Sequence, residues 1–124
     1  MSAWSPDELE RIGRRTELQV ASRRRDGSLR PYVTIWVVRA GDDLYVRSAY
    51  GPNSGWYRRA KASGEGRVRA GGDERDVSFE EPEAAVTGAV TVAYHAKYDR
   101  YGPAIVGTVV SPAAEQLTLR IMPR

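Results

Sequence analysis

The residues with the clearest chemical potential are Ser48 to Lys61, SAYGPNSGWYRRAK, where two rings and three cations follow a glycine–proline turn. A helix that begins after this turn would present free backbone N–H groups and the positive end of its dipole, which attract an anion. Phosphate suits such a place best, because backbone donors and cations can share its oxygens. The side chains that could cap the helix or bind the anion are Asn53, Ser54, Arg58, Arg59 and Lys61.

Two rings in the same stretch extend this interpretation. Trp56 and Tyr57 offer flat apolar surface beside the anion, so one site could hold both the phosphate and the ring of a nucleotide-like cofactor. A structural interpretation competes with it. In that interpretation Asn53 or Ser54 only caps a helix, Trp56 fills the core and the cations lie in solvent.

Tyr94, Lys97 and Tyr98 form a second candidate group, because their i, i+3 and i+4 spacing places them on one side of a helix. Two phenols and an ammonium there could orient a substrate or add to the anion site. The alternative is that both tyrosines pack in the interior while Lys97 extends to solvent. His95 lies about 100° further round the helix, and we expect it to be solvated.

Composition excludes several classes of site. The chain has no cysteine, which rules out disulfides, thiolate zinc sites and cysteine nucleophiles. His95 is the single histidine, so a multi-histidine metal site is excluded and we expect no metal. The N-terminus has no apolar leader, and no apolar run approaches the ~18 residues of a membrane span. A cytoplasmic protein without membrane contact is therefore expected.

The positive charge is concentrated in one part of the chain. Residues 1–72 contain 14 Lys or Arg against 8 Asp or Glu, and residues 73–124 contain 5 against 8. Such asymmetry marks a surface for anionic partners, among them phosphate-bearing cofactors and nucleic acid. We do not expect nucleic acid, because Tyr32 and Trp36 lie in the most apolar segment and no nucleic-acid motif occurs. The run Arg23 to Arg25 is interpreted as the solvated tip of a hairpin.

The elements that must position these residues follow from turn and cap signals. Ser5 before Pro6 predicts a helix over about residues 5–16. Turns at Asp26-Gly27 and Gly41-Asp42 then predict three consecutive antiparallel strands. The middle strand, Pro31 to Arg39, is apolar on both faces, which indicates a second layer or a subunit interface and leads us to predict a homodimer.

The rest of the chain completes a small sheet. After a short helix around Trp56 to Ser63, a hairpin with its turn at Gly71-Gly72-Asp73 and a closing strand over Leu117 to Ile121 are expected. A longer helix opens at Pro82 and ends before Gly102-Pro103. The predicted fold is α+β but mainly β: one domain, residues 1–124, containing a small antiparallel split β-barrel of about six strands with two or three flanking helices.

The segment RPYVTIWVVRAGDDLYVRSAYGPNSGWYRRAKASGEGRVRAGG resembles the flavin-binding split-barrel superfamily, which includes pyridoxamine phosphate oxidases and deazaflavin-dependent nitroreductase-like proteins. AYHAKYDRYG and the terminal LTLRIMPR resemble a bacterial branch known as a domain of unknown function. The resemblance covers about Glu17 to the C-terminus. It implies an FMN-binding type of split barrel, with the cofactor ring at a dimer interface and its phosphate held by basic and hydroxyl side chains.

Position by position, the resemblance implies that the cofactor is bound by Arg47, Ser48, Asn53, Ser54, Trp56, Arg58 and Arg59. Arg47 and Arg59 are predicted to form the cationic part of the anion site. The functional hypothesis is an oxidoreductase in which FMN or a deazaflavin supplies hydride chemistry, no side-chain nucleophile is needed, and Tyr94, Lys97 and Tyr98 face an unknown small-molecule substrate. The alternative hypothesis is a cofactor-free split barrel that acts as a binding or interaction module.

Overall fold

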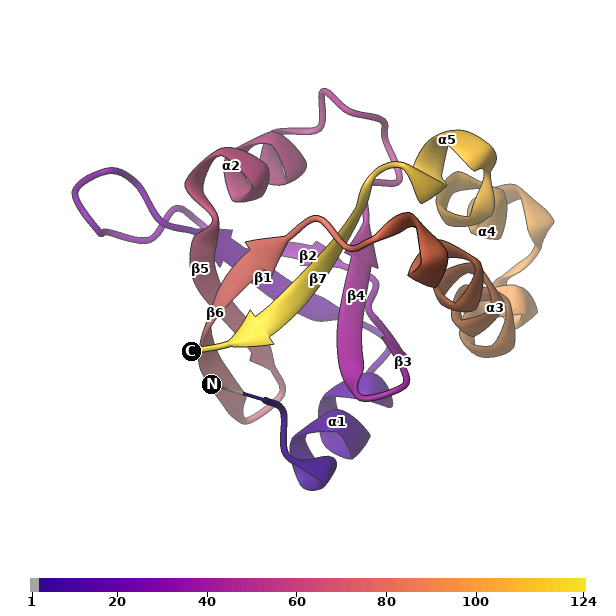
Figure 1. Cartoon of the computed structure of the whole chain (residues 1–124), viewed down its shortest axis with the longest axis horizontal. Helices are drawn as coiled ribbons and strands as arrows, with labels where there is room; N and C mark the ends of the chain where they lie inside the picture. The colour runs from indigo at the N-terminus through magenta and orange to yellow at the C-terminus, as the bar shows by residue number, and fades with distance from the viewer. Residues whose placement is uncertain (1–2) are drawn as a thin grey trace.

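The computed structural model describes residues 3–124, in which seven strands form one antiparallel sheet in the order β2-β1-β5-β6-β7-β4-β3. The sheet curls into a half-barrel with helices at its ends and along one side (Figure 1). This confirms the predicted class, a small antiparallel split barrel with flanking helices. Residues 1 and 2 of the predicted domain lie outside the described residues.

The bounds of the elements are as follows. The strands are β1 (Leu18–Ser22), β2 (Val33–Ile35), β3 (Val38–Ala40), β4 (Asp43–Arg47), β5 (Glu65–Ala70), β6 (Asp73–Glu80) and β7 (Thr118–Pro123). The helices are α1 (Pro6–Gly13), α2 (Gly55–Ser63), α3 (Thr87–Tyr98), α4 (Pro103–Val110) and α5 (Pro112–Glu115), with 3₁₀ turns η1 (Ala84–Val86) and η2 (Asp99–Tyr101).

The segment predicted as one middle strand is two strands. β2 pairs with β1 and β3 pairs with β4, at opposite edges of the sheet. Strand pairing stops at Trp36 and Val37, where α3 supplies the hydrogen bonds instead. The Val37 N–H donates to the Tyr98 hydroxyl at 3.2 Å, and the Val37 carbonyl accepts from Lys97 Nζ at 2.6 Å. The prediction of a continuous strand was wrong, because this segment crosses from one edge of the curled sheet to the other.

The apolar outer face of β3 and β4 is covered by the chain itself. Val38 and Tyr45 pack with Val90, Tyr94 and Tyr98 of α3 in a second core outside the half-barrel. In the same region the Trp36 ring stacks on the Tyr98 ring, with centroids 3.9 Å apart and an interplanar angle of 3°. The second apolar face of Pro31 to Arg39, from which we predicted a homodimer, therefore has an intramolecular partner.

α1 closes one end of the half-barrel. The Ser5 side chain accepts from the Glu8 N–H, and the Glu8 carboxylate accepts from the Ser5 N–H, so the predicted N-cap is confirmed as a capping box. Leu9 and Ile12 are buried in the main core. The helix ends at Gly13, before the predicted end near residue 16.

Gly66 lets β1 and β5 approach closely. A Cβ at this position would lie 2.1 Å from the Ala21 carbonyl oxygen and 2.8 Å from the Phe79 ring. Both distances are far below van der Waals contact, so a glycine is required here. This close pairing brings β1, and the loop that follows it, next to α2.

α4 and α5 occupy a segment for which the sequence analysis predicts no helix. Its Val, Ile, Thr and Gly residues have low helix propensity, and the helix forms because Val106 and Val109 are buried against α3. Within residues 3–124, no helix has both the length and the apolarity that a bilayer crossing requires.

Candidate functional site

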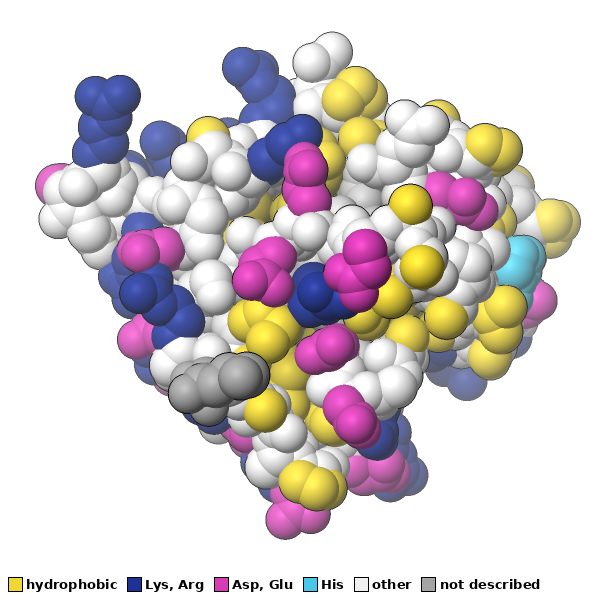
Figure 2. All heavy atoms as spheres, in the orientation of Figure 1, with side chains coloured by type: hydrophobic (Ala, Val, Ile, Leu, Met, Phe, Trp, Pro, Cys, Tyr) yellow, Lys and Arg dark blue, Asp and Glu magenta, His cyan; other side chains and the backbone are white. Residues whose placement is uncertain are grey.

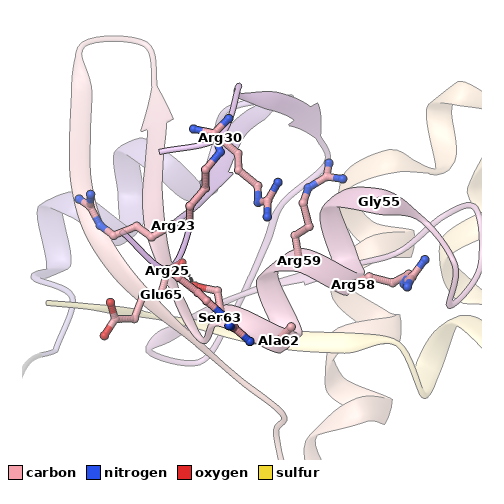
Figure 3. Close-up of a pocket in the computed structure, with 10 residues that line it drawn as sticks. Arg23, Arg25, Arg30, Gly55, Arg58, Arg59, Ala62, Ser63 and Glu65 are labelled. Carbon is pink, nitrogen blue, oxygen red and sulfur yellow. Dashed lines mark hydrogen bonds between the residues drawn. The ribbon is translucent and has the colours of Figure 1, made fainter. Parts of the chain in front are cut away.

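An arginine-rich groove of 810 Å³ lies between the β1–β2 loop and α2. Figure 3 shows its lining side chains, and Figure 2 shows Lys and Arg side chains gathered over this part of the surface. We call it the arginine groove. Its lining residues are Arg23, Arg24, Arg25, Arg30, Gly55, Arg58, Arg59, Ala62, Ser63 and Glu65.

The positive charge of the arginine groove is only partly neutralised. Arg23 pairs with Asp76 at 2.9 Å. Among the described residues, one carboxylate lines the groove, Glu65, and it pairs with Arg124 at 2.6 Å. Among the arginines that line the groove, four guanidiniums make neither an ion pair nor a hydrogen bond within residues 3–124: those of Arg25, Arg30, Arg58 and Arg59. Several cations facing one volume repel one another, which favours an anionic ligand.

Arg59 lies over the N-terminus of α2. Its Nη1 is 2.7 Å from the place a Cβ of Gly55 would occupy, so the missing side chain makes room for the guanidinium. Ser54 holds the N-cap position, but its side chain makes no capping hydrogen bond. A cation at the positive end of a helix dipole is unfavourable unless an anion lies with it. In Figure 3, Arg30 and Arg59 lie across the same gap, while Arg58 points away from it.

The rings predicted to flank the anion lie in the core. Trp56 is 9% exposed and Tyr57 3% exposed, and their rings meet edge to face with centroids 6.0 Å apart. Burial raises the pKa of Tyr57. These side chains anchor α2 to the half-barrel, so they give the arginine groove no flat aromatic wall. Asn53 is exposed in the loop before α2.

Arg47 is separate from the arginine groove. It is 2% exposed and lies under α3 and α4, on the outer face of β4. Its guanidinium donates to the Thr118 and Thr91 hydroxyls and to the Val109 and Thr87 carbonyls, at 2.8 to 2.9 Å. Burial lowers its pKa. Arg47 was predicted to join Arg59 in one anion site, and none of these hydrogen bonds brings the two guanidiniums together. The reason is that α3 and α4 cover the face of β4 on which Arg47 lies.

Ser48 also has an internal role. It is 1% exposed, and its hydroxyl donates to the Gly51 carbonyl at 2.6 Å. This bond closes the turn that leads from β4 toward α2, and the backbone N–H of Ser48 donates to the Leu117 carbonyl at 3.3 Å. Ser48 therefore shapes the loop that precedes α2.

Tyr94, Lys97 and Tyr98 lie on one face of α3, as predicted, and that face is turned inward. Tyr94 and Tyr98 are fully buried, and burial raises the pKa of both phenols. The Tyr94 hydroxyl has no hydrogen-bond partner among the described residues. Burial, with Arg100 nearby, lowers the pKa of Lys97 to about 8. Lys97 and Tyr98 hydrogen-bond the backbone at the break between β2 and β3, and none of the three side chains lines the arginine groove.

The sequence analysis missed the contribution of the β1–β2 loop. The sequence predicts a solvated hairpin tip for Arg23 to Arg25 and no role for Arg30, whereas in the fold Arg23, Arg24, Arg25 and Arg30 line the arginine groove together with residues of α2. The local signal was the density of arginines around the Asp26-Gly27 turn. Nothing in that pattern identifies a helix some thirty residues later as the opposite wall.

Comparisons with known proteins agree with this fold. A family profile described as an uncharacterized protein conserved in bacteria (DUF2255) matches residues 8–121. No curated protein sequence matches the chain. The conserved hypothetical protein Rv2991 from Mycobacterium tuberculosis has a similar structure, with a TM-score of 0.65 and 14% identity over 99% of this chain and 82% of that chain.

Two further similar structures are of proteins named for cofactors. An F420 reductase matches with a TM-score of 0.55 and 21% identity, over 93% of this chain and 90% of that one. An FAD-binding protein from Mesorhizobium loti matches with a TM-score of 0.54 and 16% identity, over 98% and 91%. At these identities the likeness concerns the fold, and it confirms the predicted split-barrel resemblance.

Proposed function

The chain belongs to the bacterial protein family DUF2255, and from this premise and its fold we propose that it binds a flavin- or deazaflavin-type cofactor through the arginine groove. The observation that carries the proposal is the set of unpaired guanidiniums that faces the N-terminus of α2. Support also comes from similar structures named for F420 and FAD. We propose an oxidoreductase role toward a small molecule on the same basis.

The donor set fits the anionic part of such a cofactor. Arg25, Arg30 and Arg59 supply charge that no carboxylate of residues 3–124 pairs with, and the Ser54 side chain leaves the first N–H groups of α2 uncapped. The groove offers no aromatic surface for the cofactor ring, since Trp56 and Tyr57 lie in the core. The fit therefore applies to phosphate or carboxylate groups, and the ring must lie outside the arginine groove.

A bound flavin or deazaflavin would supply hydride transfer. The part of this chain is to bind and orient the cofactor, and the exposed guanidiniums of the arginine groove are the residues placed to do so. The buried Arg47 and Ser48 support the loop and the helix behind the site. In this proposal Tyr94, Lys97 and Tyr98 maintain the fold, because their polar atoms are buried or bonded to backbone.

A second candidate is a cofactor-free module that binds an anion in the arginine groove. The observation that favours it is the absence of an exposed aromatic side chain from the described lining. Such a module would bind inorganic phosphate or pyrophosphate as well as it binds any nucleotide. Binding measurements separate the two candidates.

The test is calorimetric titration of the purified protein with FMN, FAD, a deazaflavin cofactor, riboflavin and pyrophosphate. We expect a phosphorylated cofactor to bind more tightly than riboflavin, and the double variant Arg30→Gln, Arg59→Gln to weaken it by about tenfold or more. Higher salt should reduce this difference. Arg100→Gln removes an exposed arginine on η2 and serves as the matched control.

Two results would count against the cofactor proposal. If no flavin or deazaflavin binds while pyrophosphate does, the anion-binding module is correct. If a cofactor binds equally well to the wild-type protein and to the double variant, its anionic part lies outside the arginine groove.

A further inference from the structure

A cavity of about 10 Å³ lies between β1, β2 and the buried side of α2. This volume is enough for one water molecule or one oxygen atom of a ligand. A cavity this small brings its lining side chains around a single position. We call it the Ser22 cavity, and its lining residues are Val20, Ser22, Pro31, Val33, Trp56, Arg59 and Ala60.

The Ser22 side chain is largely buried, and its hydroxyl is unused by the fold. Ser22 follows Val20 on the inner face of β1 and is 6% exposed. Its carbonyl accepts from the Arg30 N–H at 2.9 Å, but its hydroxyl makes no hydrogen bond within residues 3–124. Because polar groups at this depth are nearly always bonded, the unused hydroxyl indicates that it binds something other than the chain itself.

A ligand oxygen can reach this hydroxyl. Among the described residues, the Tyr94 hydroxyl is the one polar side-chain atom that is both sealed from solvent and unbonded. The unbonded Ser22 hydroxyl is not sealed in this way, so it keeps some contact with solvent. Arg59 lines the Ser22 cavity as well as the arginine groove, so an anion in the groove lies beside the cavity.

The side chains around this position favour an acceptor atom. No carboxylate lines the cavity among the described residues, and Arg59 supplies positive charge. The Trp56 indole N–H has no hydrogen-bond partner within residues 3–124, whereas that of Trp4 donates to the Ile121 carbonyl at 2.8 Å. A hydroxyl, an indole and a guanidinium together offer donors to one oxygen atom.

The surroundings of the cavity favour a terminal phosphate as the source of this oxygen. Arg30 and Arg59 lie across the same gap (Figure 3), and neither guanidinium has a partner within residues 3–124. A terminal phosphate carries three acceptor oxygens and close to two negative charges. It can therefore place one oxygen in the Ser22 cavity and present the others to Arg30 and Arg59. A carboxylate, or a phosphate within a diphosphate linkage, has fewer free oxygens.

We propose that Ser22 is a ligand-binding residue that donates to one oxygen of a phosphate monoester, and this rests on the proposed function. The oxygen lies in the Ser22 cavity, and the guanidiniums of Arg30 and Arg59 neutralise the rest of the phosphate. Among flavins, FMN carries such a group, riboflavin has none, and FAD has its phosphates in a diphosphate linkage.

The experiment changes the Ser22 cavity and leaves the arginines in place. Ser22→Ala removes the hydroxyl, whereas Ser22→Val fills the cavity with a methyl group. Ser78→Ala and Ser78→Val are the matched controls, because Ser78 is a half-buried serine of β6 that lines neither the Ser22 cavity nor the arginine groove. Calorimetry measures binding of FMN, FAD, riboflavin and inorganic phosphate, and urea unfolding measures the stability of each variant.

We expect the wild-type protein to bind FMN more tightly than FAD or riboflavin. Ser22→Ala should weaken binding of FMN and of inorganic phosphate by about tenfold, because a hydrogen bond to a charged group is lost. Ser22→Val should weaken both further. Riboflavin binding and the free energy of unfolding should stay unchanged in Ser22→Ala, because the hydroxyl has no partner in the fold. Both Ser78 variants should bind every ligand like the wild type.

Three results would overturn the inference. The first is wild-type affinity for FMN in both Ser22 variants; the proposed function then stands if the double variant Arg30→Gln, Arg59→Gln still loses affinity. The second is tighter binding of FAD than of FMN. The third is a Ser22→Ala variant that is less stable but binds FMN normally, since the hydroxyl would then hold a structural water. If the wild-type protein binds no flavin, the inference and the proposed function both fail.

Discussion

At the scale of single residues, the arginines divide by whether their hydrogen bonds are satisfied. The buried Arg47 donates to acceptors from β7, α3 and α4, so its charge is solvated by the protein. The Arg59 guanidinium has no such acceptors in the described structure and lies at the positive end of α2. The first arrangement stabilises the fold, and the second is suited to a ligand.

Arg47→Ala should destabilise the protein without changing ligand binding. The substitution leaves the Val109 and Thr87 carbonyls without their donor, and we expect the free energy of unfolding to fall by about 3 kcal/mol. Urea unfolding measures this loss, and pyrophosphate titration of the folded variant should match the wild type. A variant of unchanged stability but weak pyrophosphate binding would restore Arg47 to the anion site.

Lys97 should make stability depend on pH. Its pKa is about 8 in the folded state and about 10.4 when unfolded, so between these values the unfolded chain binds more protons. The free energy of unfolding should therefore rise from pH 8 to pH 10. Lys97→Met should remove most of this rise and still fold, because the Tyr98 hydroxyl lies 3.0 Å from the Val37 carbonyl and can replace the lysine. A parallel pH profile in both proteins would contradict this.

At the scale of elements, α3 determines where the sheet ends. It covers the outer face of β3 and β4 and supplies the hydrogen bonds where pairing stops between β2 and β3. A short, curled sheet exposes backbone at its open side, and polar side chains of a packed helix can satisfy that backbone. Lys97 and Tyr98, which we predicted to face a substrate, therefore satisfy the backbone where the chain crosses from one edge of the sheet to the other.

Tyr98→Phe tests this role of α3. The hydroxyl accepts from the Val37 N–H and lies 2.6 Å from the Thr16 carbonyl, so its removal should cost about 2 kcal/mol of unfolding free energy. Hydrogen exchange of the Val37 amide should accelerate more than that of sheet amides. Tyr101→Phe is the control, because Tyr101 is exposed and its hydroxyl accepts from the neighbouring Arg100 and makes no bond to the Val37 backbone within residues 3–124. Equal effects of the two substitutions would refute the role.

Gly66→Ala should disrupt the pairing of β1 with β5. The new methyl group would collide with the Ala21 carbonyl and the Phe79 ring, and we expect a loss of about 3 kcal/mol or more. Gly88→Ala in α3 meets nothing within 4 Å and should instead stabilise the protein by about 0.5 kcal/mol. Thermal unfolding of both variants measures the contrast, and a neutral Gly66→Ala would show that the strands can separate without cost.

At the scale of the whole molecule, charge and apolar surface lie in different regions. The arginine groove borders α2, whereas the exposed side chains of Val92, Tyr101 and Ile105 lie on α3, η2 and α4. Figure 2 shows hydrophobic side chains on the side of these helices. We propose that this second region contributes to a homodimer, since apolar surface of this kind favours association.

The homodimer prediction is tested by sedimentation. We expect a dimer at micromolar concentration, and the double variant Val92→Asp, Ile105→Asp should sediment as a monomer, because charges oppose burial in an interface. Tyr50→Ser alters a side chain that is 87% exposed in the loop before α2 and serves as the control. A wild-type protein that remains monomeric would contradict the proposal.

Local signals in the sequence determined much of the fold. Ser5 and Pro6 predicted the start of α1, the turn at Gly71-Gly72-Asp73 predicted the hairpin of β5 and β6, and SAYGPNSGWYRRAK predicted α2 with Arg58 and Arg59 on its accessible side. These features depend on residues a few positions apart, where caps, turns and periodicity act. The split-barrel class and half of the arginine groove could be predicted for that reason.

The tertiary structure alone decided the rest. In a regular strand, alternation predicts that Arg47 and Leu44 point to opposite faces of the sheet. It does not predict which face a helix will cover. In the fold, α3 and α4 cover the face that carries Arg47. The break at Trp36 and Val37 depends on Tyr98, which lies 61 positions after Val37. The approach of the β1–β2 loop to α2 depends on the pairing of β1 with β5 at Gly66. Contacts between distant segments follow from packing, which no local pattern encodes.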